Sequence, residues 1–182
     1  MLRIKVKGRE FYDDKTNEFI YSKDTILQLE HSLVSISKWE SKWKKSFLNS
    51  KEKSPAEFLD YVRCMCITQN VSEDVFRSLD KDNFTTIQEY MNDTMTATVL
   101  PASAQKSKGG SRDVITSELI YYWMVSLQIP FECQRWHLNR LLTLIDICNI
   151  KNTPPKKMST SEILNRNKAL NAARRAKYHS AG

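Results

Sequence analysis

The sequence predicts an α+β fold that is mainly α-helical, with an N-terminal β-hairpin or meander followed by a bundle of about five to seven helices. Apolar residues alternate with polar ones through residues 2–30, and from residue 32 onward they recur every three or four positions. Only four Gly and five Pro interrupt the 182 residues. We expect residues 1–152 to form a single globular domain and residues 153–182 a basic C-terminal helix or tail.

The composition excludes several classes of protein. Hydrophobic residues make up 41% of the chain, which is enough for a core and argues against disorder, collagen-like repeats and a disulfide scaffold. No apolar run reaches the ~18 residues of a membrane span, and the first residues lack the apolar stretch of a secretion signal. We therefore expect a soluble, non-exported protein whose four cysteines are reduced thiols in apolar helical surroundings.

The β-element is expected at about residues 2–30. Ile4 and Val6 are spaced by two, as are Phe19 and Tyr21, and residues 13–17 between these runs are rich in turn formers. This pattern predicts a hairpin or a three-stranded meander. The helical core is expected at about residues 32–150.

An aromatic stripe opens the helical core. Its residues are Leu33, Ile36, Trp39, Trp43 and Phe47. Their spacing predicts one amphipathic helix whose stripe faces the interior rather than an interface. Ser54 and Pro55 then begin a second helix, with Glu57 placed to complete a capping box. Shorter helices are expected at about 72–79 and 84–92.

Residues 94–113 lose all periodicity and are predicted to form a flexible loop. Thr116 then opens the most apolar stretch, LIYYWMVSLQI, which we expect to lie in the middle of the domain. Pro130 should end or kink this helix, and helical periodicity resumes through residues 131–150.

The C-terminal segment holds all of the net charge. Residues 151–182 contain eight basic residues and one acid, Glu162, whereas the first 150 residues contain 20 of each sign. Ser159 and Glu162 repeat the capping-box pattern and should open a helix that runs to about Lys177. The candidate partner-binding residues are Lys156, Lys157, Arg166, Lys168, Arg174, Arg175 and Lys177. They suit a phosphate backbone, an acidic protein or an anionic membrane face, or simply a solvated tail.

No residue pattern indicates catalysis, a metal site or a cofactor. His31, His137 and His179 lie far apart, and Cys133 with His137 is the nearest approach to a ligand pair or a nucleophile with its base, four residues apart on one expected helix. Residues 108–112, KGGSR, lack the phosphate-loop signature. We therefore expect a protein that acts by binding and is not an enzyme.

Several long stretches resemble small proteins from the tail-gene regions of tailed bacteriophages. They are LEHSLVSISKWESKWKKSFL (29–48), ELIYYWMVSLQIPFECQRWHLNRLLTLIDICNIKN (118–152), and the KKMSxSE and ALNAARRAK segments that follow. The family that these stretches resemble is the tail assembly chaperones. The resemblance covers roughly residues 10–178 and contains no chemical motif.

The resemblance implies a role in assembling the virion. A tail assembly chaperone binds the tape-measure protein and helps to recruit tail-tube subunits, without catalysis, and this implies a location in the host cell cytoplasm or in association with the virion. Other phage tail proteins and a second copy of the chain are further partners left open. The alternative is a nucleic-acid-binding phage head, neck or regulatory protein that uses the basic tail on the phosphate backbone. No membrane partner is expected.

Overall fold

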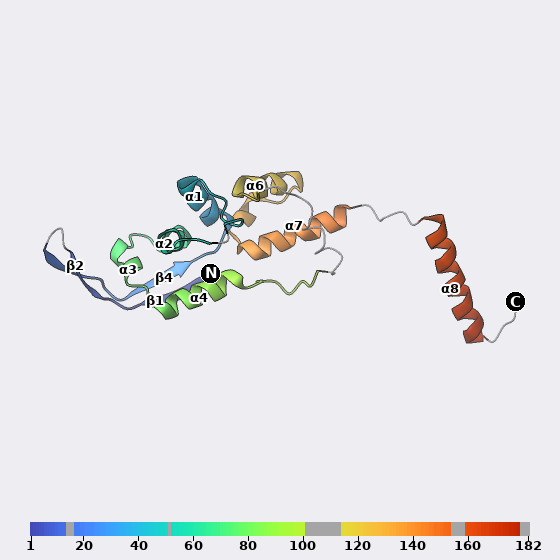
Figure 1. The fold of residues 1–182 in the computed structure, drawn as a ribbon, viewed down its shortest axis with the longest axis horizontal. Helices are drawn as coiled ribbons and strands as arrows, with labels where there is room; N and C mark the ends of the chain where they lie inside the picture. Colours follow the sequence, from blue (N-terminus) through green and yellow to red (C-terminus); the bar gives the residue numbers. More distant parts are fainter. Residues whose placement is uncertain (14–16, 51, 101–113, 154–158, 179–182) are drawn as a thin grey trace. The chain divides into compact units, whose positions relative to one another are not determined.

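The fold is seen in a computed structural model (Figure 1). It describes residues 1–13, 17–50, 52–100, 114–153 and 159–178. These residues form seven α-helices, one 3₁₀ helix and four strands, so the prediction of a mainly helical α+β fold is confirmed. The chain divides into two units, Met1–Ile150 and Lys151–Gly182, which we describe separately as the body and the C-terminal unit.

The strands form a single antiparallel ribbon at the start of the body. They are β1 (Leu2–Val6), β2 (Glu10–Asp13), β3 (Glu18–Tyr21) and β4 (Thr25–Leu29). β1 pairs with β4 and β2 with β3 in one constant register, with Leu2 opposite Leu29 and Asp13 opposite Glu18. Of the two topologies that the sequence left open, the structure therefore shows the hairpin. We call the β1–β4 pair its inner half and the β2–β3 pair its outer half, and the strand pairing is interrupted between them.

The interruption in the ribbon depends on Gly8. A Cβ atom at this position would lie 2.2 Å from the backbone oxygen of Ser22, so no larger residue fits without movement of the backbone. Ser22 N–H donates to the Arg9 carbonyl at 2.9 Å, and Asp24 Oδ1 accepts from Gly8 N–H, also at 2.9 Å. These bonds carry the pairing across the break.

Helix α1 (Leu33–Trp43) begins where the helical period starts in the sequence, with Ser32 as its cap, but it ends earlier than expected. Lys44 adopts the left-handed conformation with φ of 54°, which stops the helix. Phe47 therefore lies beyond the helix, although it is still buried. The prediction of one helix through Phe47 is wrong. The prediction of a buried stripe is confirmed for every member except Trp43, which is half-buried.

The remaining helices of the body are α2 (Pro55–Met65), α3 (Glu73–Arg77), α4 (Lys81–Asn92), α6 (Ser117–Ser126), the 3₁₀ helix η2 (Phe131–Arg135) and α7 (Leu138–Asn152). Helices α2, α3 and α6 begin at the predicted capping residues, whereas α4 begins before residue 84, where its start was expected. Ser54, Ser72 and Thr116 each accept a backbone N–H in the first turn of α2, α3 and α6. Of the predicted loop 94–113, residues 94–100 contain no helix or strand and the remainder lies outside the described residues.

The segment after Pro130 is two helices rather than one. The 3₁₀ helix η2 ends at Arg135, and α7 starts at Leu138. Cys133 and His137 therefore do not share a helix, so the expectation that they lie four residues apart on one helix is wrong.

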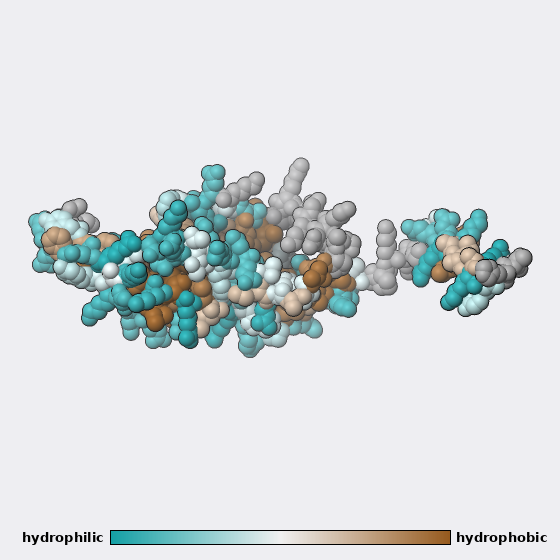
Figure 2. Space-filling model, turned by 90° about the horizontal axis from the view of Figure 1, so that it is seen from below, coloured by the Kyte–Doolittle hydropathy of each residue, from teal (hydrophilic) through white to brown (hydrophobic). Residues whose placement is uncertain are grey.

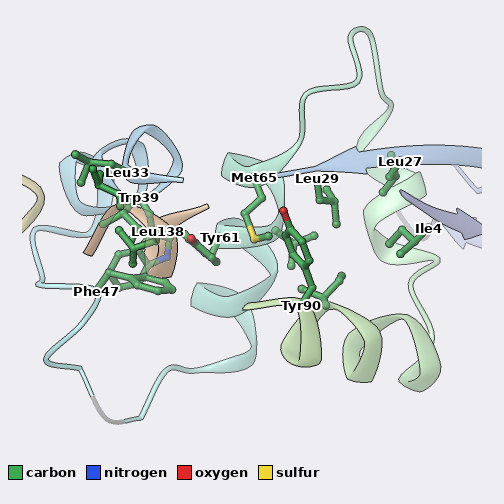
Figure 3. Close-up of a cluster of buried hydrophobic side chains, with 14 of the residues drawn as sticks. Ile4, Leu27, Leu29, Leu33, Trp39, Phe47, Tyr61, Met65, Tyr90 and Leu138 are labelled. Atoms are coloured by element: carbon green, nitrogen blue, oxygen red, sulfur yellow. The ribbon is translucent and has the colours of Figure 1, made fainter. Parts of the chain in front are cut away.

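The core extends from the ribbon to α1 (Figure 3). At one end Ile4 and Leu27 come from the inner half of the ribbon; Met65 and Tyr90 lie between the ends, and Trp39 packs at the other end. All these side chains are buried. The inner half of the ribbon is thus part of the core.

Helix α6 is not the central helix that its apolar sequence predicts. Its Ile120 and Met124 are buried, but Tyr122 is 64% exposed and Val125 is 59% exposed. The helix packs on one side and leaves apolar residues on the other, because hydrophobic content alone does not say how many faces of a helix are covered.

Candidate functional site

Helix α8 (Thr160–Tyr178) has no buried residue. Its stability therefore comes from local interactions. Ser159 Oγ accepts from Glu162 N–H at 3.3 Å, and Glu162 Oε2 accepts from Ser159 N–H at 2.7 Å. This is the capping box that the sequence predicts. The hydrogen bond from the Ser159 backbone lowers the pKa of Glu162, so the carboxylate stays ionised at the positive end of the helix dipole.

The basic side chains of α8 are all exposed. They are Arg166, Lys168, Arg174, Arg175 and Lys177. The candidate residues Lys156 and Lys157 lie outside the described residues. Three of the five described basic residues fall in the last five positions of the helix, where positive charge interacts favourably with the dipole. The ammonium of Lys177 lies 5.6 Å from the ring centroid of Tyr178.

An apolar strip accompanies this charge. Ile163 and Leu170 are seven residues apart and so lie on one face, with Arg166 and Arg174 close to that face. Figure 2 shows the helix as mainly hydrophilic with a narrow hydrophobic strip. Such a helix can bind a partner that offers negative charge beside a small apolar surface.

A second exposed surface lies on α6 and η2 in the body. We call it the α6 surface, and its exposed residues are Tyr122, Val125 and Phe131. Tyr121 connects them, since it is one turn from Val125 and its ring centroid is 6.4 Å from that of Phe131. Exposed aromatic and aliphatic side chains that adjoin one another are typical of protein interaction sites.

The α6 surface is held in place by a buried carboxylate of α1. Glu40 Oε2 accepts from Ser117 N–H at the start of α6, and Glu40 Oε1 accepts from Phe47 N–H, both at 2.7 Å. The α6 surface is thus presented by a helix whose first turn is fixed to the core.

A third exposed apolar region was not predicted from the sequence. In the outer half of the ribbon Tyr12, Phe19 and Tyr21 are exposed, and Phe11 and Ile20 on the opposite face are only half-buried. The adjacent apolar residues in EFY (10–12) and EFIY (18–21) are the sequence feature that could have indicated this exposed region. Consecutive apolar residues in a strand point to both faces, and a two-stranded ribbon covers neither.

The two described histidines are part of the core. The ring centroids of His31 and His137 are 5.1 Å apart, although the residues are far apart in sequence. His31 Nδ1 is 2.5 Å from the Tyr61 hydroxyl, and His137 Nε2 is 2.9 Å from the Tyr90 carbonyl. Burial and the neighbouring His137 lower the pKa of His31 to about 3, so its imidazole is neutral.

The other candidate groups show no assembled chemical site. Burial raises the pKa of the thiols of Cys64, Cys66 and Cys133, which keeps them protonated. Among the described residues, no three His, Cys, Asp or Glu side chains are grouped so as to hold a metal ion. His179 and the KGGSR segment lie outside these residues.

Comparisons with protein-family models, with curated proteins and with solved structures give no match to this chain. In the described part of the chain, none of the helices has the length and apolar character needed to cross a bilayer.

Proposed function

We propose that the chain is a non-enzymatic phage assembly factor, a tail assembly chaperone that binds the tape-measure protein and helps to recruit tail-tube subunits. The observation that carries the proposal is the uncovered state of α8 and of the α6 surface. Binding of a long helical client requires exposed apolar groups that accept its helices, together with enough charge to remain in solution. The α6 surface supplies the apolar groups, and α8 supplies the charge.

The resemblance of residues 29–48 and 118–152 to tail assembly chaperones supports the choice of client. In the body these stretches correspond to α1 with its following turn and to α6, η2 and α7. The first stretch contains Glu40 and the second contains the α6 surface, which Glu40 holds through Ser117. The two stretches that carry the resemblance are therefore joined in the structure.

Co-purification with the tape-measure protein tests the proposal. A tagged tape-measure protein from the same genome should capture the full-length chain when the two are co-expressed. Tyr122→Ser combined with Val125→Ser should reduce capture at least tenfold, because both side chains are exposed and their loss leaves the core intact. Ile26→Ser is the control, since Ile26 is equally exposed on β4. Absence of capture with the wild-type chain would refute the proposal.

The contribution of α8 is tested with a charge variant in the same assay. Arg166, Arg174 and Arg175 are replaced together by Gln, and capture should fall if the client is acidic at the site of contact. The matched control replaces three exposed basic residues of the body, Arg3, Lys7 and Lys81, by Gln.

The alternative function is binding of nucleic acid, and the full exposure of the basic side chains on α8 favours it. Contacts with several phosphates would make affinity for DNA fall by orders of magnitude between about 50 and 200 mM salt. The part of client binding that the α6 surface contributes should remain over this range, since it depends on burial of apolar area. Fluorescence anisotropy with a labelled DNA duplex, measured across this range, separates the two functions.

A further inference from the structure

The outer half of the ribbon has two edges that no other described strand covers. β2 and β3 form a two-stranded ladder with each other alone, whereas β4 in the inner half receives a further bridge, between Leu29 and Cys66. An uncovered edge offers unpaired backbone N–H and C=O groups, and proteins ordinarily cover or blunt it. Either edge could therefore accept a further strand.

The pairing within the ribbon shows which backbone groups face outward. Ser22 N–H donates to the Arg9 carbonyl, so Arg9 and Ser22 are a bonded pair. Bonded and non-bonded pairs alternate along an antiparallel ladder. Phe11 and Ile20, the second pair along, are therefore bonded to each other, and the flanking residues of β3, Phe19 and Tyr21, direct their backbone groups to the free edge.

Side chains distinguish the edge of β3 from that of β2. Phe19 is 61% exposed and Tyr21 is 71% exposed, so both outward positions of β3 carry exposed aromatic rings. On β2 the outward positions are Glu10 and Tyr12, of which only one is aromatic. Aromatic pairs are among the most favourable cross-strand neighbours. The edge of β3 is thus the better docking edge.

We propose that the free edge of β3 pairs antiparallel with the same edge of a second copy of the chain. The product is a four-stranded sheet in the order β2–β3–β3–β2 with a two-fold axis at its centre. In the register centred on Ile20, Phe19 of each copy lies opposite Tyr21 of the other, and the outward backbone groups of both residues are bonded. This inference does not depend on the proposed function.

Charge supports a second copy as the occupant. We call the end of the outer half at Asp13 and Glu18 its tip and the end at Arg9 and Ser22 its base. Antiparallel pairing places the tip of one ribbon beside the base of the other. Glu18 near the tip and Arg9 near the base are exposed and lie on the face that carries Ile20. In this register Glu18 lies opposite Ser22 of the second copy, whose own ribbon partner is Arg9. Opposite charges therefore approach each other twice, once on each side of the two-fold axis.

Cysteine cross-linking in the full-length chain tests the register. Ile20→Cys places two thiols at a non-bonded pair on the axis, where Cα atoms lie about 4.5 Å apart and a disulfide fits. Phe11→Cys is the matched control, because Phe11 is opposite Ile20 on the same face and is also half-buried. Its two thiols would be three strand spacings apart, roughly 14 Å, beyond the reach of a disulfide.

We expect mild oxidation to give a covalent dimer of Ile20→Cys, but not of Phe11→Cys or of the wild type. Cross-linking of Phe11→Cys alone would show pairing through β2 and overturn the proposal. Failure of both variants to cross-link would overturn it as well.

Sedimentation velocity over a concentration series tests self-association without new cysteines. The wild-type chain should form dimers as the concentration rises. Tyr21→Pro removes one outward N–H while leaving the bonds between β2 and β3, and it should weaken dimerisation by about tenfold or more. Ile26→Ser should dimerise as the wild type does, and far-ultraviolet circular dichroism checks that both variants are folded. A wild-type chain that stays monomeric throughout would contradict the proposal, and this outcome is expected if the edge receives a strand from a different protein.

Discussion

Glu40 is a buried acid whose carboxylate is shared by two backbone groups from distant parts of the chain. Its two oxygens accept from Phe47 N–H just after α1 and from Ser117 N–H at the start of α6. Both bonds are buried, so neither donor has access to water as a substitute partner. A single side chain therefore supplies the acceptors that the backbone does not offer to these two N–H groups.

Replacement of Glu40 by Ala should lower the free energy of unfolding by about 2–4 kcal/mol, because it leaves two buried N–H groups without an acceptor. Urea denaturation followed by tryptophan fluorescence measures the change. Glu89→Ala is the control, since Glu89 is exposed on α4 and its loss should change stability by less than about 0.5 kcal/mol. Equal stabilities of the two variants would contradict this role for Glu40.

The buried histidines should make stability depend on pH. Burial lowers the pKa of both His31 and His137 below the ordinary value of 6.5, to about 3 for His31. As the pH falls through 6.5 the unfolded chain binds protons and the folded chain does not, so the stability from these histidines is complete above 6.5 and is lost progressively below it, toward pH 3 for His31. We expect a loss of up to about 1.4 kcal/mol per pH unit from each histidine.

Urea denaturation between pH 7.5 and 5 measures this loss without interference from acids. Glu57, for example, has its pKa lowered to about 2, mainly by its hydrogen bond with Lys45, and so contributes a loss of stability only below its ordinary value of 4.5. His31→Gln should make the pH dependence shallower, because it removes the histidine whose pKa is lowered to about 3. An unchanged slope in this variant would exclude His31 as a source of the effect.

At the scale of the elements, the close approach of the two ribbon strands at Gly8 depends on the absence of a side chain there. Gly8→Ala places a methyl group 2.2 Å from the Ser22 oxygen, where backbone rather than a flexible side chain would have to move. We expect the free energy of unfolding to fall by about 1–3 kcal/mol. Lys7→Ala, at the neighbouring exposed position, should be close to neutral in the same denaturation experiment. A neutral Gly8→Ala variant would show that the ribbon junction relaxes freely.

The starts of α2, α3, α6 and α8 could be predicted from the sequence, whereas the start of α4, the end of α1 and the surroundings of α6 could not. Ser54, Ser72, Thr116 and Ser159 act within one turn of themselves, so their patterns are visible locally. The end of α1 at Lys44 is different, because a lysine in the left-handed conformation has no distinctive sequence pattern.

Tertiary contacts decide the features that the sequence left undetermined. His31 approaches His137 because the segment after β4 meets the start of α7. A hydrogen bond joins the two segments there, since Leu138 N–H donates to the His31 carbonyl at 2.7 Å. The exposure of Tyr122 likewise depends on how much of α6 its neighbours cover. Such outcomes arise from packing between distant segments and have no local periodicity to indicate them.

At the scale of the whole molecule, charge and packing are divided between different parts of the chain. The first 150 residues are electrically balanced and hold the buried core, whereas residues 151–182 hold the excess of seven positive charges. No described residue of α8 is buried. The basic charge can therefore serve binding without being needed for folding of the body.

Truncation after Asn152 tests this division. It removes seven basic residues and one acid but no described side chain that is buried, so the free energy of unfolding should stay within about 0.5 kcal/mol of that of the full chain. A second truncation, after Leu144, also removes Ile145, which is 3% exposed, and should cost at least about 2–5 kcal/mol. Denaturation with urea compares the three proteins, and cation-exchange chromatography verifies the loss of charge. A large destabilisation by the first truncation would mean that the C-terminal unit contributes to folding of the body, and binding defects of that truncation would then no longer locate the partner on α8.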